Sequence, residues 1–260
     1  MKKNKRYKII IIVLVVYLLV FFLFLGLKNI KNKNQKITLL IGDSTVWEYE
    51  NKTWFNITSN SRIDNLSWQK YEVFLDNKYK GNYDLWYDDT KWYAFNQDKT
   101  PVNLEGELIA YKANHDLKIK DFEVRETTNN TYVHQILRDN NLKTSSQLTV
   151  NNVVNIDIDN DGINEDIYTI SNAFPFDFTP EKYFAMVFMV KEEIIYPIYT
   201  NIESAKYGNS CKPFIRAFLD IEDDNHYEII ISCGRYSIQK PEDMLYQLKN
   251  NKFKQVISNQ

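Results

Sequence analysis

One acidic segment carries the most specific chemical signal in this sequence. Within nine residues, carboxylates stand at positions 1, 3, 5 and 9 and a glycine at position 6; these residues are Asp157, Asp159, Asp161, Glu165 and Gly162. Oxygen atoms at this spacing, together with the position-7 carbonyl of Ile163, can surround a hard cation, and Ca²⁺ takes about six to eight oxygen ligands. Without a cation the carboxylates repel one another. The sequence therefore predicts a calcium site in residues 157–165.

A second segment repeats the pattern 63 residues later. Its acidic positions and its position-7 carbonyl are supplied by Asp220, Glu222, Asp224, Glu228 and His226. Asn225 replaces the glycine, and asparagine is among the residues that adopt positive φ most readily. Glu222 is longer than the usual aspartate, so we predict a second calcium loop with a looser fit.

Neither segment is an EF-hand loop. Such a loop needs a glutamate at position 12, which is Tyr168 in the first segment. The flanks 153–156 and 167–170 are also rich in β-branched residues, which favours strands rather than helices. The alternative interpretation of both segments is an acidic turn that holds no metal.

A different pattern raises the alternative of an esterase. The segment that ends in Gly42, Asp43 and Ser44 resembles the first block of SGNH/GDSL esterases, and the Asp223-x-x-His226 pattern resembles the acid and base of that family. A nucleophilic serine needs such a base within hydrogen-bond reach. That fold, however, contains several crossover helices, and the sequence predicts one short helix. We therefore predict that the protein is not an enzyme.

The two cysteines, Cys211 and Cys233, flank the second acidic segment. A bridge between them would close a loop of 22 residues. In an oxidising compartment such a bridge is favoured, so we predict a disulfide; two buried thiols are the alternative.

The elements that position these residues are mostly strands. Runs of aromatic and β-branched residues alternate with Asn/Asp/Lys turns throughout residues 37–260. In the second half, strands at 148–157, 166–171, 183–190 and 194–200 form one unit, and strands at 213–221, 228–232, 244–248 and 253–257 form the next. We predict an all-β fold of hairpin repeats, propeller-like or a sandwich, with at most one short helix, at 131–140, after the N-terminal region.

One hairpin spacing recurs three times. The pairs Tyr49 and Trp54, Tyr87 and Trp92, and Leu248 and Phe253 each flank four polar residues that include Asn or Asp. Asn and Asp tolerate the backbone conformations of tight turns. We expect each pair of large side chains to meet across its hairpin as core, rather than as a platform for a ligand.

Two acidic loops between strands resemble the calcium-binding FG-GAP/VCBS repeats of integrin-like β-propellers. The resemblance covers residues 148–257, although the FG and GAP tripeptides themselves are absent. It implies that the acidic positions named above are metal ligands, and that the protein binds partners or glycans outside the cell. The chain as a whole resembles membrane-anchored bacterial proteins of this kind.

The N-terminal region differs in charge from the rest of the chain. Residues 9–27 are 19 residues without a charge, enough for a helix of about 28 Å, close to the thickness of a bilayer core. A cleaved signal peptide has a shorter apolar core and a small-residue cleavage site, which this segment lacks. Nine of the 32 basic residues precede residue 37, and all 34 acidic residues follow it, so residues 37–260 have a net charge of −11. That balance disfavours binding to nucleic acid.

These observations predict a single-pass protein of the cell membrane with a cytoplasmic N-terminus. Its expected parts are a cytoplasmic tail (1–8), a transmembrane anchor (9–27), a polar tether (28–36), an N-terminal β-hairpin region (37–147) and a calcium-loop β-repeat region (148–260). The predicted function is non-catalytic binding outside the cell, to wall glycan or to a surface protein. A structural envelope component and an extracytoplasmic sensor are the alternatives.

Overall fold

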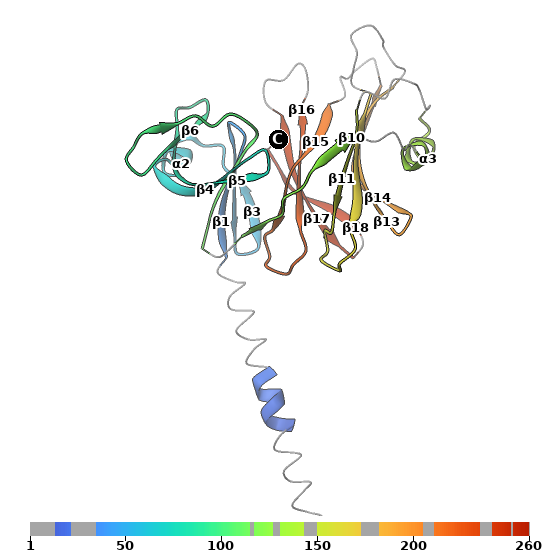
Figure 1. Ribbon diagram of the computed structural model, residues 1–260, viewed down its shortest axis with the longest axis horizontal. Helices are drawn as coiled ribbons and strands as arrows, with labels where there is room; N and C mark the ends of the chain where they lie inside the picture. The colour runs from blue at the N-terminus through green and yellow to red at the C-terminus, as the bar shows by residue number, and fades with distance from the viewer. Residues whose placement is uncertain are drawn as a thin grey trace, which may run out of the picture.

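A computed structural model describes residues 14–21, 35–114, 117–126, 131–142, 150–172, 182–204, 211–234, 241–250 and 252–259. Residues 14–21 form a helix with exposed side chains, set apart from the folded body (Figure 1). Within the described ranges, no helix is both long and apolar enough to cross a membrane. The remainder of the predicted anchor and the predicted tail lie outside these ranges, as does most of the tether.

Antiparallel strands dominate the described chain and form three open sheets. The first sheet has eight strands in the order β3-β2-β1-β8-β4-β5-β6-β7. These strands are β1 (Lys36–Ile41), β2 (Thr45–Glu50), β3 (Thr53–Asn56), β4 (Gln69–Leu75), β5 (Lys78–Tyr87), β6 (Trp92–Phe95), β7 (Pro101–Val102) and β8 (Leu108–Ala113).

The two other sheets have five strands each. The second sheet, ordered along the chain, consists of β10 (Val124–Glu126), β11 (Val150–Ile156), β12 (Glu165–Ser171), β13 (Lys182–Lys191) and β14 (Ile194–Ser204). The third sheet has the order β18-β17-β16-β15-β9, with β9 (Lys118–Ile119), β15 (Lys212–Asp220), β16 (Glu228–Gly234), β17 (Glu242–Lys249) and β18 (Lys252–Ser258). The predicted two units of four strands are therefore confirmed, and each is extended by one short strand from residues 117–126.

The three sheets pack in a row, with the third sheet in the middle (Figure 1). Alternation along β16 shows why: Ile229 and Ile231 pack with the second sheet, whereas Ile230 packs with the first. Successive side chains of a strand point to opposite faces, so an uninterrupted apolar strand needs a partner on both faces. The middle sheet therefore has two hydrophobic faces and one neighbour for each.

Two helices cover the outer faces of this stack. Helix α3 (Thr131–Asp139) buries Val133, Ile136 and Leu137 against the second sheet, which confirms the predicted helix and its apolar face. Helix α2 (Asn60–Asp64) packs Ile63 on the first sheet. The expectation of at most one helix after the N-terminal region was therefore wrong. The five residues of α2 are too few to show a helical period in the sequence.

The three predicted hairpin pairs are confirmed. Tyr49 lies opposite Trp54 with ring centroids 5.0 Å apart, and Tyr87 lies opposite Trp92 at the same separation. Leu248 lies opposite Phe253. Asn51 has a φ of 53°, as the first turn requires.

Strand pairing does not follow the predicted division at residue 147. Strands β9 and β10 and helix α3 precede that residue, yet β9 pairs with β15, β10 pairs with β11, and α3 packs on the second sheet. The chain thus leaves the first sheet after Ala113 and joins both of the others before the repeat begins.

Candidate functional site

The first acidic loop connects β11 to β12 and is closed by the pair Ile156 and Glu165. Asn160 and Gly162 have φ angles of 56° and 88°. These two left-handed residues turn the chain sharply, so that the loop folds around the carboxylate of its first residue. Asp157 accepts hydrogen bonds from the backbone N–H groups of Asp161 and Gly162, each at 3.1 Å.

Three carboxylates converge inside this loop. Ligand oxygens of Asp157, Asp159 and Glu165 all lie within 4.8 Å of one another. Glu165 is 1% exposed, and its Oε2 accepts a hydrogen bond from the backbone N–H of Ile158 at 3.0 Å. Among the described residues, this is the one group of three acidic or metal-ligating side chains so arranged.

A lysine that the sequence did not identify stands among these carboxylates. The ammonium of Lys191, the last residue of β13, lies 2.6 Å from Asp159 Oδ2, 2.7 Å from Asp161 Oδ2 and 2.9 Å from Glu165 Oε1. Burial opposes the charged form of Lys191, but its close contacts with the three carboxylates outweigh that penalty and raise the pKa of the ammonium above its usual range. Lys191 is therefore an internal cation of the loop.

Two carboxylate oxygens in this cluster lack a hydrogen bond. Asp159 Oδ1 and Glu165 Oε1 are buried, and no hydrogen bond within the described residues reaches either atom. The ion pair with Lys191 still neutralises Glu165 Oε1, whereas Asp159 Oδ1 has no such contact. The loop carries four carboxylates, and the Lys191 ammonium contacts three of them, so the loop with this ammonium keeps a net negative charge. A buried acceptor without a partner is costly and leaves a coordination position for a cation.

The second acidic loop, between β15 and β16, repeats the backbone of the first. Asp220 accepts hydrogen bonds from the N–H groups of Asp224 and Asn225, at 3.0 and 3.1 Å. Glu228 Oε2 accepts one from the N–H of Ile221 at 2.9 Å, as Glu165 does from Ile158. Asn225 has a φ of 65°, which confirms that it takes the conformation of the glycine it replaces.

The side chains of the second loop are arranged differently. Lys118 lies 3.3 Å from Asp220 Oδ2 and 2.9 Å from Asn225 Oδ1, and its side chain is 45% exposed. The second oxygen of Glu228 accepts a hydrogen bond from Gln247 at 2.8 Å instead of facing a cation. Burial raises the pKa of Glu228 to about 8. Glu222 and His226 point outward enough to be partly or largely exposed, and among the described residues no carboxylate triplet forms in this loop.

The two acidic loops are neighbours in space. The backbone N–H of Tyr227 donates to the carbonyl of Ile158 at 2.9 Å. Lys120 lies against both loops, since its ammonium contacts the carbonyl of Asp157 and lies 4.9 Å from the ring centroid of Tyr227. Strands β12 and β15 thus present the two loops at one end of adjacent sheets.

The predicted first-loop ligands do not all converge. Asp161 reaches the triplet through Lys191 rather than by joining it. Ile163 donates its backbone N–H to Asp161 at 2.8 Å, and its side chain is exposed. The sequence did not point to Lys118, Lys120 or Lys191, because each is far along the chain from the loop that it contacts, and an isolated lysine near a hairpin gives no signal by itself.

The two cysteines form a disulfide with a Cα–Cα distance of 5.3 Å. Cys211 precedes β15 and Cys233 lies in β16, and both are fully buried. The bridge therefore joins neighbouring strands of the middle sheet, beside the core that this sheet shares with the second sheet.

The residues of the esterase pattern are placed on a hairpin. Gly42, Asp43 and Ser44 connect the antiparallel strands β1 and β2, and Ser44 lines a cavity in which no described lining residue is a histidine. His226 instead lies in the second acidic loop, where its Nδ1 is 3.5 Å from Asp224.

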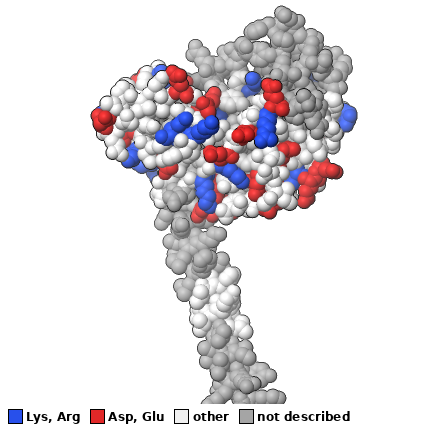
Figure 2. Space-filling model, viewed as in Figure 1, with Lys and Arg blue, Asp and Glu red and all other residues white. Residues whose placement is uncertain are grey.

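Charge on the visible face of the molecule is mixed. Figure 2 shows lysine and arginine interspersed with aspartate and glutamate over the described surface, rather than gathered in one basic patch. Comparisons of the chain with protein-family models, with curated proteins and with solved structures found no match.

Proposed function

We propose that this protein is a non-catalytic binding module outside the cell, anchored by residues 9–27, whose loop 157–165 binds calcium. The observation that carries the calcium assignment is the carboxylate triplet of Asp157, Asp159 and Glu165 together with the unsatisfied, buried Asp159 Oδ1. Calcium accepts six to eight oxygen ligands in flexible geometry, so water and loop carbonyls would complete its shell.

The repeat supports a propeller-like arrangement of the FG-GAP/VCBS type. Two loops with the same hydrogen-bond frame lie at one end of adjacent antiparallel sheets. In such a repeat each unit packs its sheet against the next, as the shared hydrophobic cores do here. The role that we propose is binding of wall glycan or a surface protein.

Lys191 sets the expected strength of calcium binding. Its ammonium occupies the space among three carboxylates, so a calcium ion must displace it and forfeits that ion pair. The lysine stem is flexible, and Lys191 is 19% exposed at the edge of a hairpin, which gives the ammonium a route to solvent. This competition favours the weak affinity of extracellular sites, with Kd values of about 10⁻⁴–10⁻³ M.

The test is a thermal melt of the full-length protein in detergent, with calcium and with chelator. At about 1 mM calcium and a Kd near 10⁻⁴ M, linkage adds roughly 1.4 kcal/mol to the unfolding free energy. Asp159→Ala with Asp161→Ala should abolish most of that gain. The matched control, Asp121→Ala with Glu123→Ala, removes two exposed acids outside the loops and should keep it. An identical melt with calcium and chelator would show that the loop is an acidic turn neutralised by Lys191.

The anchor and its orientation have a separate test. Mass spectrometry of membrane-extracted protein should recover the peptide of residues 2–8 attached to the chain. Protease added to intact cells should digest residues 37–260 and spare that peptide. A mature protein that begins beyond residue 28 would overturn the anchor.

A further inference from the structure

A polar cavity lies between the first and third sheets. It has a volume of about 420 Å³ and is lined by the turn 42–44, the segment around Glu107, and residues of β15 and β17. None of the described residues of the two acidic loops lines it. Pockets for small ligands span about 300–1,000 Å³, so the cavity can hold one or two sugar rings.

A buried charged network forms one wall of this cavity. Arg216 and Asp243 are 5% and 2% exposed, and Arg216 Nε lies 3.2 Å from Asp243 Oδ1. Ser232 and Thr45 donate to the same carboxylate, Thr45 at 2.6 Å. Burying an ion pair carries a desolvation penalty that hydrophobic residues would avoid. Its presence beside a cavity points to a role beyond packing.

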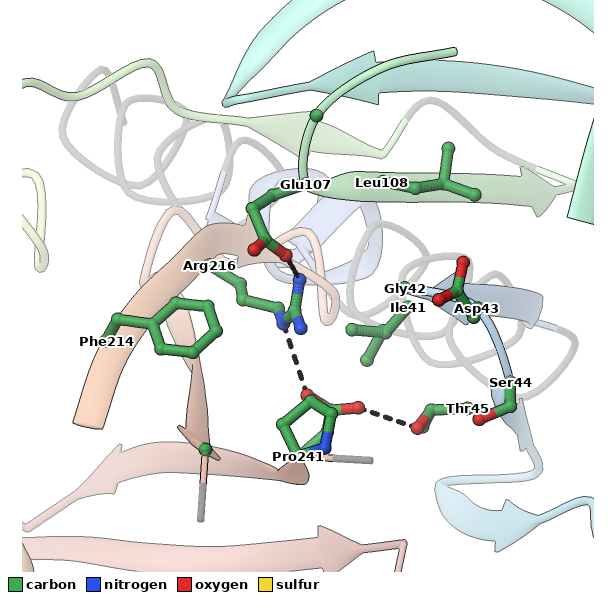
Figure 3. A pocket seen from close by; sticks show the side chains of 13 residues that line it. Ile41, Gly42, Asp43, Ser44, Thr45, Glu107, Leu108, Phe214, Arg216 and Pro241 are labelled. Atoms are coloured by element: carbon green, nitrogen blue, oxygen red, sulfur yellow. Dashed lines mark hydrogen bonds and ion pairs between the residues drawn. The ribbon is translucent and has the colours of Figure 1, made fainter. Parts of the chain in front are cut away.

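One end of the Arg216 guanidinium faces the cavity. Figure 3 shows the guanidinium between Glu107 and Pro241, with Phe214 beside it. A guanidinium has five N–H donors; Nε bonds Ser232 and Asp243, and Nη1 bonds Glu107. No hydrogen bond within the described residues uses Nη2. A Cβ on Gly42 would lie 3.6 Å from Nη2, so the missing side chain keeps this donor open.

The charges of the cavity select against ionic ligands. The described lining holds one guanidinium, that of Arg216, and three carboxylates, those of Glu107, Asp243 and Asp43, so an anion meets a net negative site. The carboxylates of Glu107 and Asp243 are already paired with Arg216. A cationic ligand could therefore pair only with Asp43 among these three, and Asp43 lies on an exposed turn. A neutral ligand with adjacent donors and acceptors avoids both penalties.

We propose that this cavity binds a neutral saccharide unit. Arg216 Nη2 would donate to one hydroxyl, and the outer oxygen of Glu107 would accept from its neighbour; such charge-assisted bonds are stronger than neutral ones. The Arg216 guanidinium lies over one face of the half-buried Phe214 ring, 4.8 Å from its centroid, so the remaining face or edge of the ring is the apolar wall for the C–H face of the sugar. The proposal deepens the surface-binding role and rests on it, but it does not depend on calcium.

The experiment titrates the full-length protein with N,N′-diacetylchitobiose, maltose and laminaribiose, in chelator and in a polyoxyethylene detergent that carries no sugar. Calorimetry or saturation-transfer NMR should show saturable millimolar binding of at least one disaccharide. Glu107→Ala should weaken it about tenfold, equivalent to 1.4 kcal/mol. Glu105→Ala changes an exposed acid two residues away that does not line the cavity, and should leave the affinity unchanged.

Each outcome decides the proposal. Binding of none of the three disaccharides, or binding that Glu107→Ala leaves unaltered while the melting temperature is normal, would overturn it. Tighter binding of acetate or of ethanolamine than of every disaccharide would assign the cavity to an ion instead. If calcium still raises the melting temperature in either case, the calcium assignment of loop 157–165 holds although the saccharide proposal fails.

Discussion

The acidic loops 157–165 and 220–228 share one backbone frame and differ in how their charge is compensated. In both, the first aspartate accepts two backbone N–H groups, and the final glutamate is buried and bonds the second residue of the loop. In the first loop a partly buried lysine sits among three carboxylates, whereas in the second a more exposed lysine lies at the edge. Residues within each loop thus determine its backbone conformation, and lysines from neighbouring strands determine how far its negative charge is neutralised.

The final glutamates show the same contrast. Glu165 directs its second oxygen to the ammonium of Lys191 at 2.9 Å, and Glu228 directs its second oxygen to the neutral amide of Gln247 at 2.8 Å. Burial raises the pKa of Glu228 and favours its protonated form, whereas Glu165 contacts a cation. We therefore expect the first loop to be the better cation site, although the two backbones match.

The largest expected effect comes from removing the internal cation of the first loop. In chelator, Lys191→Met leaves a buried carboxylate cluster uncompensated, and the loss of unfolding free energy should be about 3 kcal/mol. Calcium should restore most of it and bind more tightly than to the wild type, because no ammonium competes. Denaturant titrations with calcium and with chelator measure both effects. A variant with unchanged stability in chelator would show that Lys191 does not neutralise the cluster.

The disulfide braces the sheet that carries the second loop. Replacing Cys211 and Cys233 by alanine should lower the unfolding free energy by about 3 kcal/mol, the chain-entropy value for a loop of this size. Hydrogen exchange should rise in β15 and β16 more than in β11 and β12. In the wild type, alkylation without reductant should modify neither cysteine. Rapid labelling of both thiols in freshly purified protein contradicts the bridge.

The buried glutamate of the second loop should make stability depend on pH. The pKa of Glu228 is about 8 in the fold, against 4.5 for an ordinary glutamate. Between these values the folded state holds a proton that the unfolded state releases, so this group lowers stability as the pH rises from 4.5 to 8. Glu228→Gln keeps an oxygen that can accept the hydrogen bond from the Ile221 N–H but cannot ionise, so this variant should flatten the slope of stability against pH. Thermal melts of the wild type and the variant between pH 4.5 and 8, in chelator, measure this slope. A slope that is the same in both proteins would show that other groups cause the pH dependence.

Calcium should distinguish the two loops by a smaller amount. Asp220→Asn with Asp224→Asn should remove less of the calcium-dependent stabilisation than Asp159→Ala with Asp161→Ala, which should remove most of roughly 1.4 kcal/mol. The gain between chelator and calcium is compared within each variant, so that a general loss of stability cancels. Equal losses for the two pairs would show that both loops bind the ion.

The smallest effect is expected at Lys118. Its side chain is 45% exposed, and its contacts to Asp220 and Asp223 are 3.3 and 3.4 Å. Solvent screens such a pair, so Lys118→Met should lower the unfolding free energy by at most about 1 kcal/mol in chelator. A loss as large as that of Lys191→Met would remove the distinction between the loops.

Much of the fold followed from local patterns. Hairpin spacing identified the pair Tyr49 and Trp54, and the apolar face of residues 131–140 identified α3. The sequence did not predict helix α2, because five residues are too few to show the helical repeat of apolar side chains. It did not predict that β9 pairs with β15, because a strand of two residues shows no alternation of apolar and polar side chains. In the candidate site, the acidic residues were visible, but the lysines were not.

The sequence by itself determined the two loop frames, because left-handed residues at positions 4 and 6 and an acceptor at position 1 act within nine residues. Tertiary structure decided which charges meet. Lys191 reaches Asp159 across 32 residues because β13 pairs with β12 in the same sheet. Arg216 reaches Glu107 across 109 residues because the first and third sheets pack together. Electrostatic contacts depend on distance in space and not along the chain, so only packing could place an ammonium in the loop and a guanidinium beside the cavity.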